Sequence, residues 1–363
     1  MSHSSERAAR ERMVVAMSGG VDSSLAAALA AEQGFEVIGV TMHLSGSTSR
    51  CCSLADVDDA RRVAEKLGVR FFVANYSDEF QREVIDVFAD SYLEGRTPIP
   101  CVACNKRFKF DHLLARAEVF GASVVATGHY ARIDSDPETG LRRLRRARDT
   151  EKDQTYFLFQ LDQAQLSRAW FPLGELTKSE VRERARELGL VTADKPESQE
   201  ICFVPDGDYV KVVERLRPEA LGREGDIVNQ AGVVLGRHSG IHRFTVGQRK
   251  GLGIASERPL YVLALDALRR RVVVGEAEDL GSARACIREV SWVEGSPPKD
   301  EFRARVQVRH RHVGAEATIE ARAGGRAEVR FDDPVRAVAP GQAAVFYVGD
   351  EVLGGGWIEA SGS

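Results

Sequence analysis

Residues 12–34 read RMVVAMSGGVDSSLAAALAAEQG, and this stretch decides the fold of the first part of the chain. The apolar run at residues 14–17 predicts a buried strand, and the alanine-rich run at residues 23–33 predicts a helix that Gly34 ends. A serine and two glycines separate the two runs. Glycine backbones let successive N–H groups point at one place, and the positive end of the next helix points there too. The junction therefore predicts a phosphate site.

A tight strand-to-helix turn with a serine cap is the alternative reading of the same residues. The hydroxyl groups on both sides of the glycines and the acidic side chain of Asp22 favour phosphate. The lysine of the ordinary P-loop, GxxxxGK followed by Ser or Thr, is missing. The residues predicted to contact a nucleotide here are Ala16, Met17, Ser18, Gly19, Gly20, Val21, Asp22 and Ser23.

Residues 13–130 alternate between predicted strands and predicted helices. Further strands are expected at residues 36–44, 71–75 and 123–127, and further helices at residues 53–67 and 109–120. This rhythm predicts a doubly wound parallel sheet in an α/β domain. Ligands of such sheets bind beyond the strand ends, where Met42, Gly128 and His129 stand. We expect Met42 near an adenine ring, and the alternative for His129 is a hydrogen-bonded structural histidine.

The residue composition and the expected secondary structure change after the first 205 residues. An arginine-rich hairpin within residues 131–160 and a capping box at Thr177–Glu180, which opens a helix to Leu188, still belong to the first part. From residue 206 onward, glycines multiply and short β-branched runs alternate with turns. We predict an α/β domain at residues 1–205, a small central β-rich domain at residues 206–281 and a β-barrel at residues 282–363.

Composition restricts the functional classes. The chain has 363 residues, a net charge of −4 and 43% hydrophobic residues, so we expect a globular protein of two or three domains with no global nucleic-acid signal. No apolar run approaches the ~20 residues that span a bilayer. The start MSHSSERAARER lacks the apolar segment of a secretory signal. We therefore expect a cytoplasmic protein without a membrane partner.

Three of the six cysteines stand in unusual surroundings. Cys101 and Cys104 lie in GRTPIPCVACNKRFKF, among proline, lysine and arginine, and Cys202 lies in SQEICF. Nearby positive charge stabilises a thiolate. A single CxxC is compatible with redox chemistry or with half of a metal site. Cys286 and the pair Cys51–Cys52 fit better as inert side chains.

The longest motifs together carry a family resemblance. The loop resembles the SGGxDS pyrophosphate loop of the N-type ATP pyrophosphatases, which split ATP between its α- and β-phosphates. The chain as a whole resembles the tRNA-specific 2-thiouridylase family from residue 13 almost to its end. The motifs that carry this resemblance are CCSLADVDDARRVAEKLG, GRTPxPxxxCNKxxKF, ATGHYAR, KDQTYFL, FPLGELTKSEVR, SQEICF, FTVGQRKGLGI and PGQAAVFY.

The resemblance implies three domains and a reaction. ATP, with Mg²⁺, adenylates the C2 oxygen of the wobble uridine of tRNA and releases pyrophosphate. Sulfur then displaces AMP and leaves 2-thiouridine. By the family pattern Cys202 carries a persulfide, and Cys104 attacks it or closes a disulfide that frees the sulfur. A cysteine desulfurase or a sulfur-relay protein is the implied donor, and the tRNAs for Lys, Glu and Gln are the implied substrates.

One position departs from the family pattern. Cys101 stands where family members commonly carry an aspartate, which puts an acid or base role at this position in doubt. The substitution brings the number of thiols to three. Cys101, Cys104 and Cys202 could together hold a 4Fe–4S cluster with one open iron. The persulfide route and the cluster route both remain open on the sequence.

The resemblance also implies tRNA contacts. They fall on His129, Lys152, Asp153, Gln154, Arg309, His310 and Gln342, and the triplet Ile99, Pro100 and Cys101 matches the segment that contacts the target base. In FRARVQVRHRHV the arginines alternate with other residues, so a strand would present a basic stripe at about 6.6 Å spacing. A solvated barrel face is the alternative. GQRKG is a further expected contact, and RRLRRAR is either a basic patch or a charged hairpin.

Two other functional classes fit parts of the sequence. An amide-forming synthetase with the same loop would need an ammonia source and would leave Cys104 and Cys202 unexplained. A tRNA-binding module without activity would not need the intact SGGVDSS. Release of pyrophosphate from ATP on addition of tRNA separates these two classes.

Overall fold

The computed structural model describes residues 10–44, 54–197, 201–204 and 207–362. The chain divides into two compact units. The first unit comprises Met1–Gln81, Cys104–Thr155 and Gln163–Phe203, and the second comprises Arg82–Ala103, Tyr156–Asp162 and Val204–Ser363. We describe each unit by itself.

A five-stranded parallel sheet forms the centre of the first unit. Its strands, in the order β3-β2-β1-β4-β7, are β3 (Arg70–Asn75), β2 (Glu36–His43), β1 (Arg12–Ala16), β4 (Val124–Ala126) and β7 (Ala169–Trp170). Every pairing between them is parallel. The predicted α/β fold with a doubly wound parallel sheet is confirmed. The predicted strand ends are right to within two residues.

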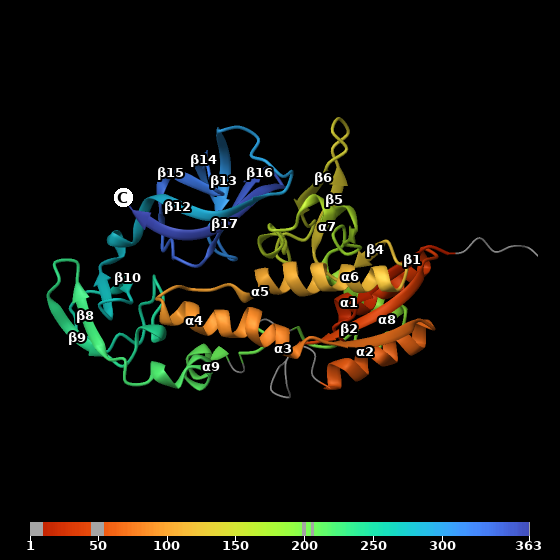
Figure 1. Cartoon of the computed structure of the whole chain (residues 1–363), viewed down its shortest axis with the longest axis horizontal. Helices are drawn as coiled ribbons and strands as arrows, with labels where there is room; N and C mark the ends of the chain where they lie inside the picture. The colour runs from red at the N-terminus through yellow and green to blue at the C-terminus, as the bar shows by residue number, and fades with distance from the viewer. Residues whose placement is uncertain (1–9, 45–53, 198–200, 205–206, 363) are drawn as a thin grey trace, which may run out of the picture. The chain divides into compact units, whose positions relative to one another are not determined.

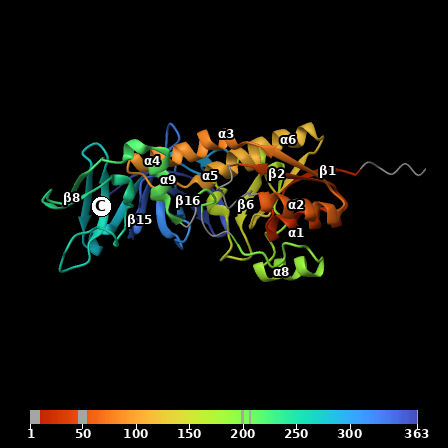
Figure 2. The ribbon, with the colours of Figure 1, turned by 90° about the horizontal axis from the view of Figure 1, so that it is seen from below.

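Helices cover both faces of this sheet. α1 (Val21–Glu32), α2 (Leu54–Leu67) and α8 (Lys178–Glu187) share one hydrophobic core with Met13 and Val15 of β1. Because side chains alternate along a strand, Val14 faces the other side, and α6 (Leu113–Val119) packs against β1 and β4 there. Figure 1 shows these helices around β1 and β2, and Figure 2 shows α6 and α8 on opposite sides of the sheet.

Local sequence signals account for the ends of these helices. Thr177 caps α8, with the Thr177 side chain accepting from the Glu180 N–H and the Glu180 side chain accepting from the Thr177 N–H, so the predicted capping box is confirmed. Gly34, Gly68 and Gly189 follow α1, α2 and α8 with φ of +89°, +67° and +59°. Such backbone angles favour glycine, as predicted for helix ends.

Shorter elements complete the first unit. They are α3 (Ser77–Phe80), the π-helix η2 (Cys104–His112), the hairpin β5 (Ala131–Ser135) and β6 (Arg142–Arg146), and α7 (Gln163–Ser167). The short helix η3 (Thr155–Phe157) begins at the last residue of a first-unit segment, and its other two residues belong to the second unit. The helix predicted over residues 109–120 is present but is not α-helical throughout, because η2 precedes α6. A π-helix bonds each N–H to the carbonyl five residues earlier and often marks a functional site.

The second unit contains two sheets. Its helical elements are η1 (Gln81–Asp86), α4 (Val87–Leu93), α5 (Pro100–Ala103), α9 (Tyr209–Leu216), η5 (Pro218–Ala220), η6 (Ile241–Arg243) and η7 (Ala277–Leu280). The smaller sheet has the order β10-β11-β8-β9, from β8 (Gly225–Asn229), β9 (Val234–His238), β10 (Tyr261–Asp266) and β11 (Arg271–Gly275). Ile227, Val262 and Val272 are fully buried in its core.

The strands after residue 280 close into a barrel. They are β12 (Gly281–Trp292), β13 (Glu301–Gln307), β14 (Ala315–Arg322), β15 (Arg326–Arg336), β16 (Ala343–Val348) and β17 (Glu351–Gly362). They run in the order β12-β15-β14-β13-β16-β17, and β12 pairs with β17 to complete the ring. Closure leaves these six strands no unpaired edge. The predicted C-terminal β-barrel is confirmed.

Several helical elements of the structure were not predicted, among them α5, α7 and the two regions that follow. The stretch from α3 to α4 had no prediction, and α9 lies where the sequence had a β texture. Arg217 at the end of α9 forms ion pairs with Asp86 and Asp90, so a contact distant in sequence stabilises α9. No helix in the described ranges is long and apolar enough to cross a bilayer.

Candidate active site

The glycine loop lies at the point where the order of the parallel strands reverses. β1 and β4 are neighbours, and the chain leaves them in opposite directions along the sheet order. Residues 17–20 follow β1, and Thr127, Gly128 and His129 follow β4. The crevice beyond the carboxyl ends of strands at such a reversal is where open α/β sheets bind ligands. The sheet therefore brings Gly128 and His129 to the loop.

The loop is held tightly by its neighbours. Gly19 has φ of +74°, and a Cβ atom there would lie 2.1 Å from the carbonyl oxygen of Asp56 in the first turn of α2. A Cβ atom on Gly128 would lie 2.7 Å from the backbone nitrogen of Ser23. The Ser23 hydroxyl accepts from the Ser18 N–H at 3.1 Å and donates to the Gly20 carbonyl at 3.2 Å.

The amides of the loop fit an anion. Among the described residues, the backbone N–H groups of Gly19, Gly20, Val21 and Asp22 have no protein hydrogen-bond acceptor. They stand at the N-terminus of the 12-residue helix α1. Unsatisfied amides at the positive end of a helix favour a phosphate group. These residues therefore fit the predicted nucleotide phosphates, and the residue assignments stay predictions.

Two lysines distant in sequence contact the loop, and each is also paired with carboxylates. Lys178, the first residue of α8, places Nζ 2.7 and 2.8 Å from the two carboxylate oxygens of Asp22. Tyr130 donates its hydroxyl to the same carboxylate at 2.8 Å, and burial followed by the charge of Asp22 raises the pKa of Tyr130. Lys178 also lies 3.1 Å from Glu197.

Lys195 joins the loop to α2. Its Nζ donates to the Gly19 carbonyl at 2.9 Å, to Asp56 at 2.7 Å and to Asp59 at 2.6 Å. Burial opposes the charge of Lys195, but the hydrogen bonds to the two carboxylates outweigh it and raise the pKa. Sequence analysis missed both lysines. Lys178 stands inside the capping box and was used only for the helix, and Lys195 lies seven residues before Cys202.

The ion pairs of Glu197 should make the stability of the fold depend on pH. Burial opposes ionisation of Glu197, but hydrogen bonds from Lys152 and Lys178 lower its pKa below 4.5. A lowered folded-state pKa stabilises the fold above pH 4.5, and this stabilisation is lost as the pH falls through the folded-state pKa. Glu197→Gln should therefore lower the melting temperature at pH 7 by roughly 2–4 °C and lower it less at pH 4.

Glu175→Gln is the matched control. It removes a carboxylate from an exposed pair with Arg132, and we expect almost no change in melting temperature at either pH. An equal loss for Glu197→Gln at pH 7 and pH 4 would contradict the ionic role of Glu197.

His129 is buried at the end of β4. Its Nδ1 lies 2.7 Å from the Thr127 hydroxyl, its Nε2 lies 3.2 Å from Nζ of Lys109, and its ring contacts Phe110 and Phe171. Burial, followed by the charge of Lys109, lowers the pKa of His129 well below 6.5, so the ring is neutral near pH 7. The structure gives His129 a structural role, and its predicted tRNA contact stays a prediction.

The two cysteines implied as catalytic lie in the first unit, with the loop. Cys104 begins η2, and Cys202 lies beside Phe203; both are half-buried. The Phe203 ring contacts Phe80 at 5.9 Å, and Phe80 contacts Phe108 of η2 at 5.4 Å. Seven residues separate Cys202 from Lys195, a span of at most ~25 Å. Cys202 therefore lies within this span of Lys195, whose side chain contacts the loop at Gly19.

Other predicted residues of the first unit are bonded within it. Lys152 pairs with Glu197 at 2.7 Å, and the buried Asp153 accepts from Arg146 at 2.8 Å and from the Thr155 hydroxyl at 2.7 Å. Gln154 exchanges two hydrogen bonds with the backbone of Tyr130. Met17 and Met42 are buried at the ends of β1 and β2. The roles predicted for these residues stay predictions.

The second unit brings other predicted residues together. Gln342 donates to the Thr97 carbonyl at 3.0 Å, which ties the start of the Ile99–Pro100–Cys101 triplet to the barrel. The next residue, Ala343, accepts from the Tyr156 hydroxyl at 3.1 Å. His310 in turn contacts Phe157 with ring centroids 4.5 Å apart. Family-implied contacts from three separate parts of the sequence thus lie in one region.

The predicted basic stripe is wrong in its second half. Strand β13 ends at Gln307, which is buried and donates to the carbonyls of Arg309 and His310, so Arg309 and Arg311 lie in a turn. Arg303 pairs with Asp332, and Arg305 pairs with Glu316. The alternation of the sequence continued beyond the strand because turn residues are polar as well.

In the arginine-rich hairpin, carboxylates pair with several of the arginine side chains. Arg143 pairs with Asp136, Arg145 with Asp134 and Arg146 with Asp153. Each of these arginines meets a carboxylate of its own hairpin or of the loop that follows. The structure therefore favours the charged hairpin over the basic patch.

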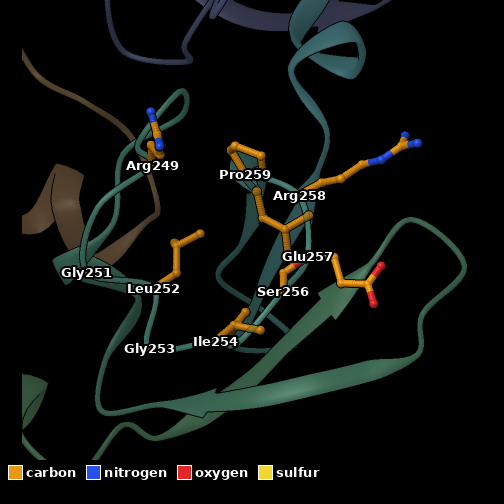
Figure 3. A pocket seen from close by; sticks show the side chains of 10 residues that line it. Arg249, Gly251, Leu252, Gly253, Ile254, Ser256, Glu257, Arg258 and Pro259 are labelled. Atoms are coloured by element: carbon orange, nitrogen blue, oxygen red, sulfur yellow. The ribbon is translucent and has the colours of Figure 1, made fainter.

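The GQRKG segment lines an open pocket in the second unit. The pocket has a volume of about 360 Å³, and Figure 3 shows its lining: the glycine-rich turn with Arg249 and Leu252 on one side and Glu257 with Pro259 on the other. Arg258 extends from this wall and pairs with Glu276 at 2.9 Å. The predicted tRNA contact of this segment stays a prediction.

The donor set for an iron–sulfur cluster is not assembled. Within the described parts of the chain, no three His, Cys, Asp or Glu side chains are grouped so that they could hold a metal ion, and these parts include Cys101, Cys104 and Cys202. Cys101 belongs to the second unit and Cys104 and Cys202 to the first, and the cluster considered from the sequence stays a proposal.

A parallel sheet with a lysine-free glycine loop at its strand-order reversal defines an α/β domain of the nucleotide-binding class. A family model described as tRNA methyl transferase HUP domain matches residues 11–206. Models described as tRNA methyl transferase PRC-barrel domain and aminomethyltransferase beta-barrel domain match residues 211–276 and 282–358.

Curated relatives match the chain over nearly its whole length. A tRNA-specific 2-thiouridylase MnmA from Geobacter metallireducens is 53% identical over 363 residues, which cover 97% of this chain and 98% of the relative. Another from Solibacter usitatus is 50% identical over 366 residues, which cover 96% and 99%. The chain belongs to the tRNA-specific 2-thiouridylase family. The resemblance stated from the motifs is confirmed.

One solved structure among the matches is distant in sequence. The U34-tRNA thiolase NcsA from Methanococcus maripaludis with its 4Fe–4S cluster is 16% identical, with a TM-score of 0.37, over 59% of this chain and 68% of that chain. Likeness at this level carries no argument for the present chain.

Proposed function

We propose that this chain is a tRNA-uridine 2-sulfurtransferase, which replaces the C2 oxygen of the wobble uridine with sulfur at the expense of ATP. Membership of the 2-thiouridylase family over 97% of the chain is the observation that carries this proposal. The structure supports it because the phosphate loop, Cys104 and Cys202 belong to one compact unit. Neither rival class of the sequence analysis accounts for all three features.

Activation comes first in the proposed reaction. The uridine C2 oxygen attacks the α-phosphorus of ATP, an O–P bond forms, and the bond to the β-phosphate breaks to release pyrophosphate. The loop amides and the positive end of α1 stabilise the negative charge that develops on the leaving pyrophosphate. Adenylation turns a poor leaving oxygen into part of a good leaving group, AMP.

Sulfur transfer follows. The terminal sulfur of a persulfide on Cys202 attacks C2, and AMP leaves with the former C2 oxygen. The Cys104 thiolate then attacks Sγ of Cys202, which closes a Cys104–Cys202 disulfide and leaves the second sulfur on the uridine. A thiol reductant returns the two cysteines to the starting state. The persulfide is loaded by a cysteine desulfurase or a sulfur-relay protein.

Further details extend the proposal. Mg²⁺ accompanies ATP, and its chemistry is to neutralise phosphate charge. The substrates are the tRNAs for Lys, Glu and Gln, and the reaction takes place in the cytoplasm. The cluster route is the alternative to the persulfide route. Iron and labile-sulfide analysis of anaerobically purified protein separates them, since full activity without iron excludes the cluster.

Nucleoside analysis tests the proposed function directly. Purified chain, tRNA that lacks the modification, ATP, Mg²⁺ and a persulfide-generating sulfur source are incubated together, and the tRNA is digested and analysed by mass spectrometry. We expect 2-thiouridine to accumulate with one AMP and one pyrophosphate per sulfur. Omission of ATP should abolish it. Absence of the thionucleoside under these conditions, with the tRNA intact, would contradict the proposed function.

A further inference from the structure

Lys109 is a described lysine of this region that has no carboxylate partner among the described residues. Lys178 meets Asp22 and Glu197, and Lys195 meets Asp56 and Asp59. Within the residues that the structure describes, Lys109 forms no ion pair, and its Nζ instead lies 3.2 Å from Nε2 of the buried His129. Lys109 therefore offers an anionic ligand an ammonium ion that no described carboxylate already neutralises.

His129 orients this ammonium ion. An ammonium group only donates hydrogen bonds, so the Lys109 contact requires Nε2 of His129 to be the acceptor. The proton of the neutral ring is then on Nδ1 and is donated to the Thr127 hydroxyl at 2.7 Å. Since Thr127 immediately follows β4, the sheet itself fixes the ring and, through it, the position of Nζ.

The same segment that ends in His129 also packs against the glycine loop. Gly128 lies so close to Asp22 and Ser23 that a Cβ atom would be 2.7 Å from the Ser23 nitrogen. Lys109 therefore contacts the residue that directly follows Gly128, the glycine that packs against the loop. If the loop amides hold the outer phosphates of ATP, the next phosphoryl group lies outside the loop, where a separate cation is needed.

The π-helix gives Lys109 its direction. In an α-helix, residues five apart differ by about 140° around the axis, at ~100° per residue. Cys104 and Lys109 both lie in η2, where a hydrogen-bonded turn joins residues five apart. Lys109 therefore stands one turn after Cys104 on a similar side of the helix, which is the side where the implied sulfur chemistry takes place.

We propose that Lys109 binds the α-phosphoryl group of ATP, the group that is transferred to the uridine, with its ammonium ion positioned by His129. This inference rests on the proposed function for the identity of the nucleotide. It assigns to Lys109 a contact distinct from those of the loop, which holds the leaving pyrophosphate.

Calorimetric titration with ATP and Mg²⁺, without tRNA, tests the inference. Lys109→Gln should raise the Kd for ATP at least tenfold, the usual size of one charge-assisted hydrogen bond. Arg107→Gln removes a positive charge from an exposed position of the same π-helix and should change the Kd less than twofold. Melting curves establish that each variant is folded, and Lys109→Met, which keeps the length of the side chain, replaces the glutamine variant if that variant does not fold.

Pyrophosphate release on addition of tRNA provides the second readout. It should fall about a hundredfold or more in Lys109→Gln, as it does when one donor to a developing charge is removed. An ATP Kd within twofold of the wild type in a folded Lys109 variant would overturn the inference. A wild type that binds ATP but releases no pyrophosphate with tRNA would instead overturn the proposed function and leave the binding comparison valid.

Discussion

A chain carrying Cys202→Ser makes no detectable 2-thiouridine but still releases pyrophosphate from ATP when tRNA is added. The two halves of the proposed reaction use different groups, and the hydroxyl of serine cannot carry a transferable sulfur. We expect thiolation to fall at least a thousandfold, as is typical when a covalent nucleophile is removed. Activation of the uridine depends on the loop and should remain within a few-fold of the wild type.

Cys286→Ser is the matched control for this experiment. Cys286 is exposed on β12 of the barrel, in the second unit, and its replacement should leave both readouts unchanged. Cys104→Ser should resemble Cys202→Ser, because the persulfide sulfur is then not released onto the uridine. Full thiolation by Cys202→Ser would refute the persulfide route, and retained activity of the amide-forming kind would favour the rival synthetase.

The second large effect is expected from Gly19→Ala, which should lower tRNA-dependent pyrophosphate release at least a hundredfold. Alanine at φ of +74° costs ~1–2 kcal/mol of backbone strain. The larger problem is steric, since the new Cβ atom would lie 2.1 Å from the Asp56 carbonyl oxygen. The loop or the start of α2 must move, and a displacement of about 1 Å at a reacting centre costs roughly a hundredfold in rate.

Gly34→Ala is the control that separates the effect of backbone strain from the effect of a steric clash of the new Cβ atom. Gly34 has φ of +89°, but nothing lies within 4 Å of a Cβ atom built there. This control should lower the melting temperature by a few degrees and leave pyrophosphate release unchanged. Pyrophosphate release by Gly19→Ala within threefold of the wild type would show that the close approach to α2 does not fix the catalytic position of the loop.

Much of the fold was predictable because its signals are local. The strands around Val14 and Ile38, the glycines after three helices and the capping box at Thr177 each depend on a few neighbouring residues. The loop was predictable for the same reason, since its chemistry follows from the order serine, glycine, glycine. The C-terminal barrel was predictable from short β-branched runs that alternate with turns, and the motifs of the family implied the same domain.

The charge pattern was not predictable because it depends on partners far apart in sequence. Lys178 and Asp22 are separated by 156 residues, and Lys195 and Asp56 by 139. The stripe in FRARVQVRHRHV failed because strand β13 ends at Gln307, where a buried amide holds the following turn. The π-helical geometry of η2 likewise has no signal in a pattern of apolar residues that suits any helix.

The contacts of residues 195–197 with the loop have a consequence for two events, the binding of nucleotide at the loop and the binding of a partner at the segment that carries Cys202. Lys195 grips the Gly19 carbonyl, and Glu197 shares Lys178 with Asp22, only a few residues before Cys202. If phosphate draws either lysine away from its present carboxylates, the cysteine-bearing segment loses an anchor. A partner that binds this segment would then change the affinity for nucleotide by the same factor by which nucleotide changes the affinity for that partner. Binding of the sulfur donor to this segment and binding of ATP to the loop would then influence each other without a separate regulatory site.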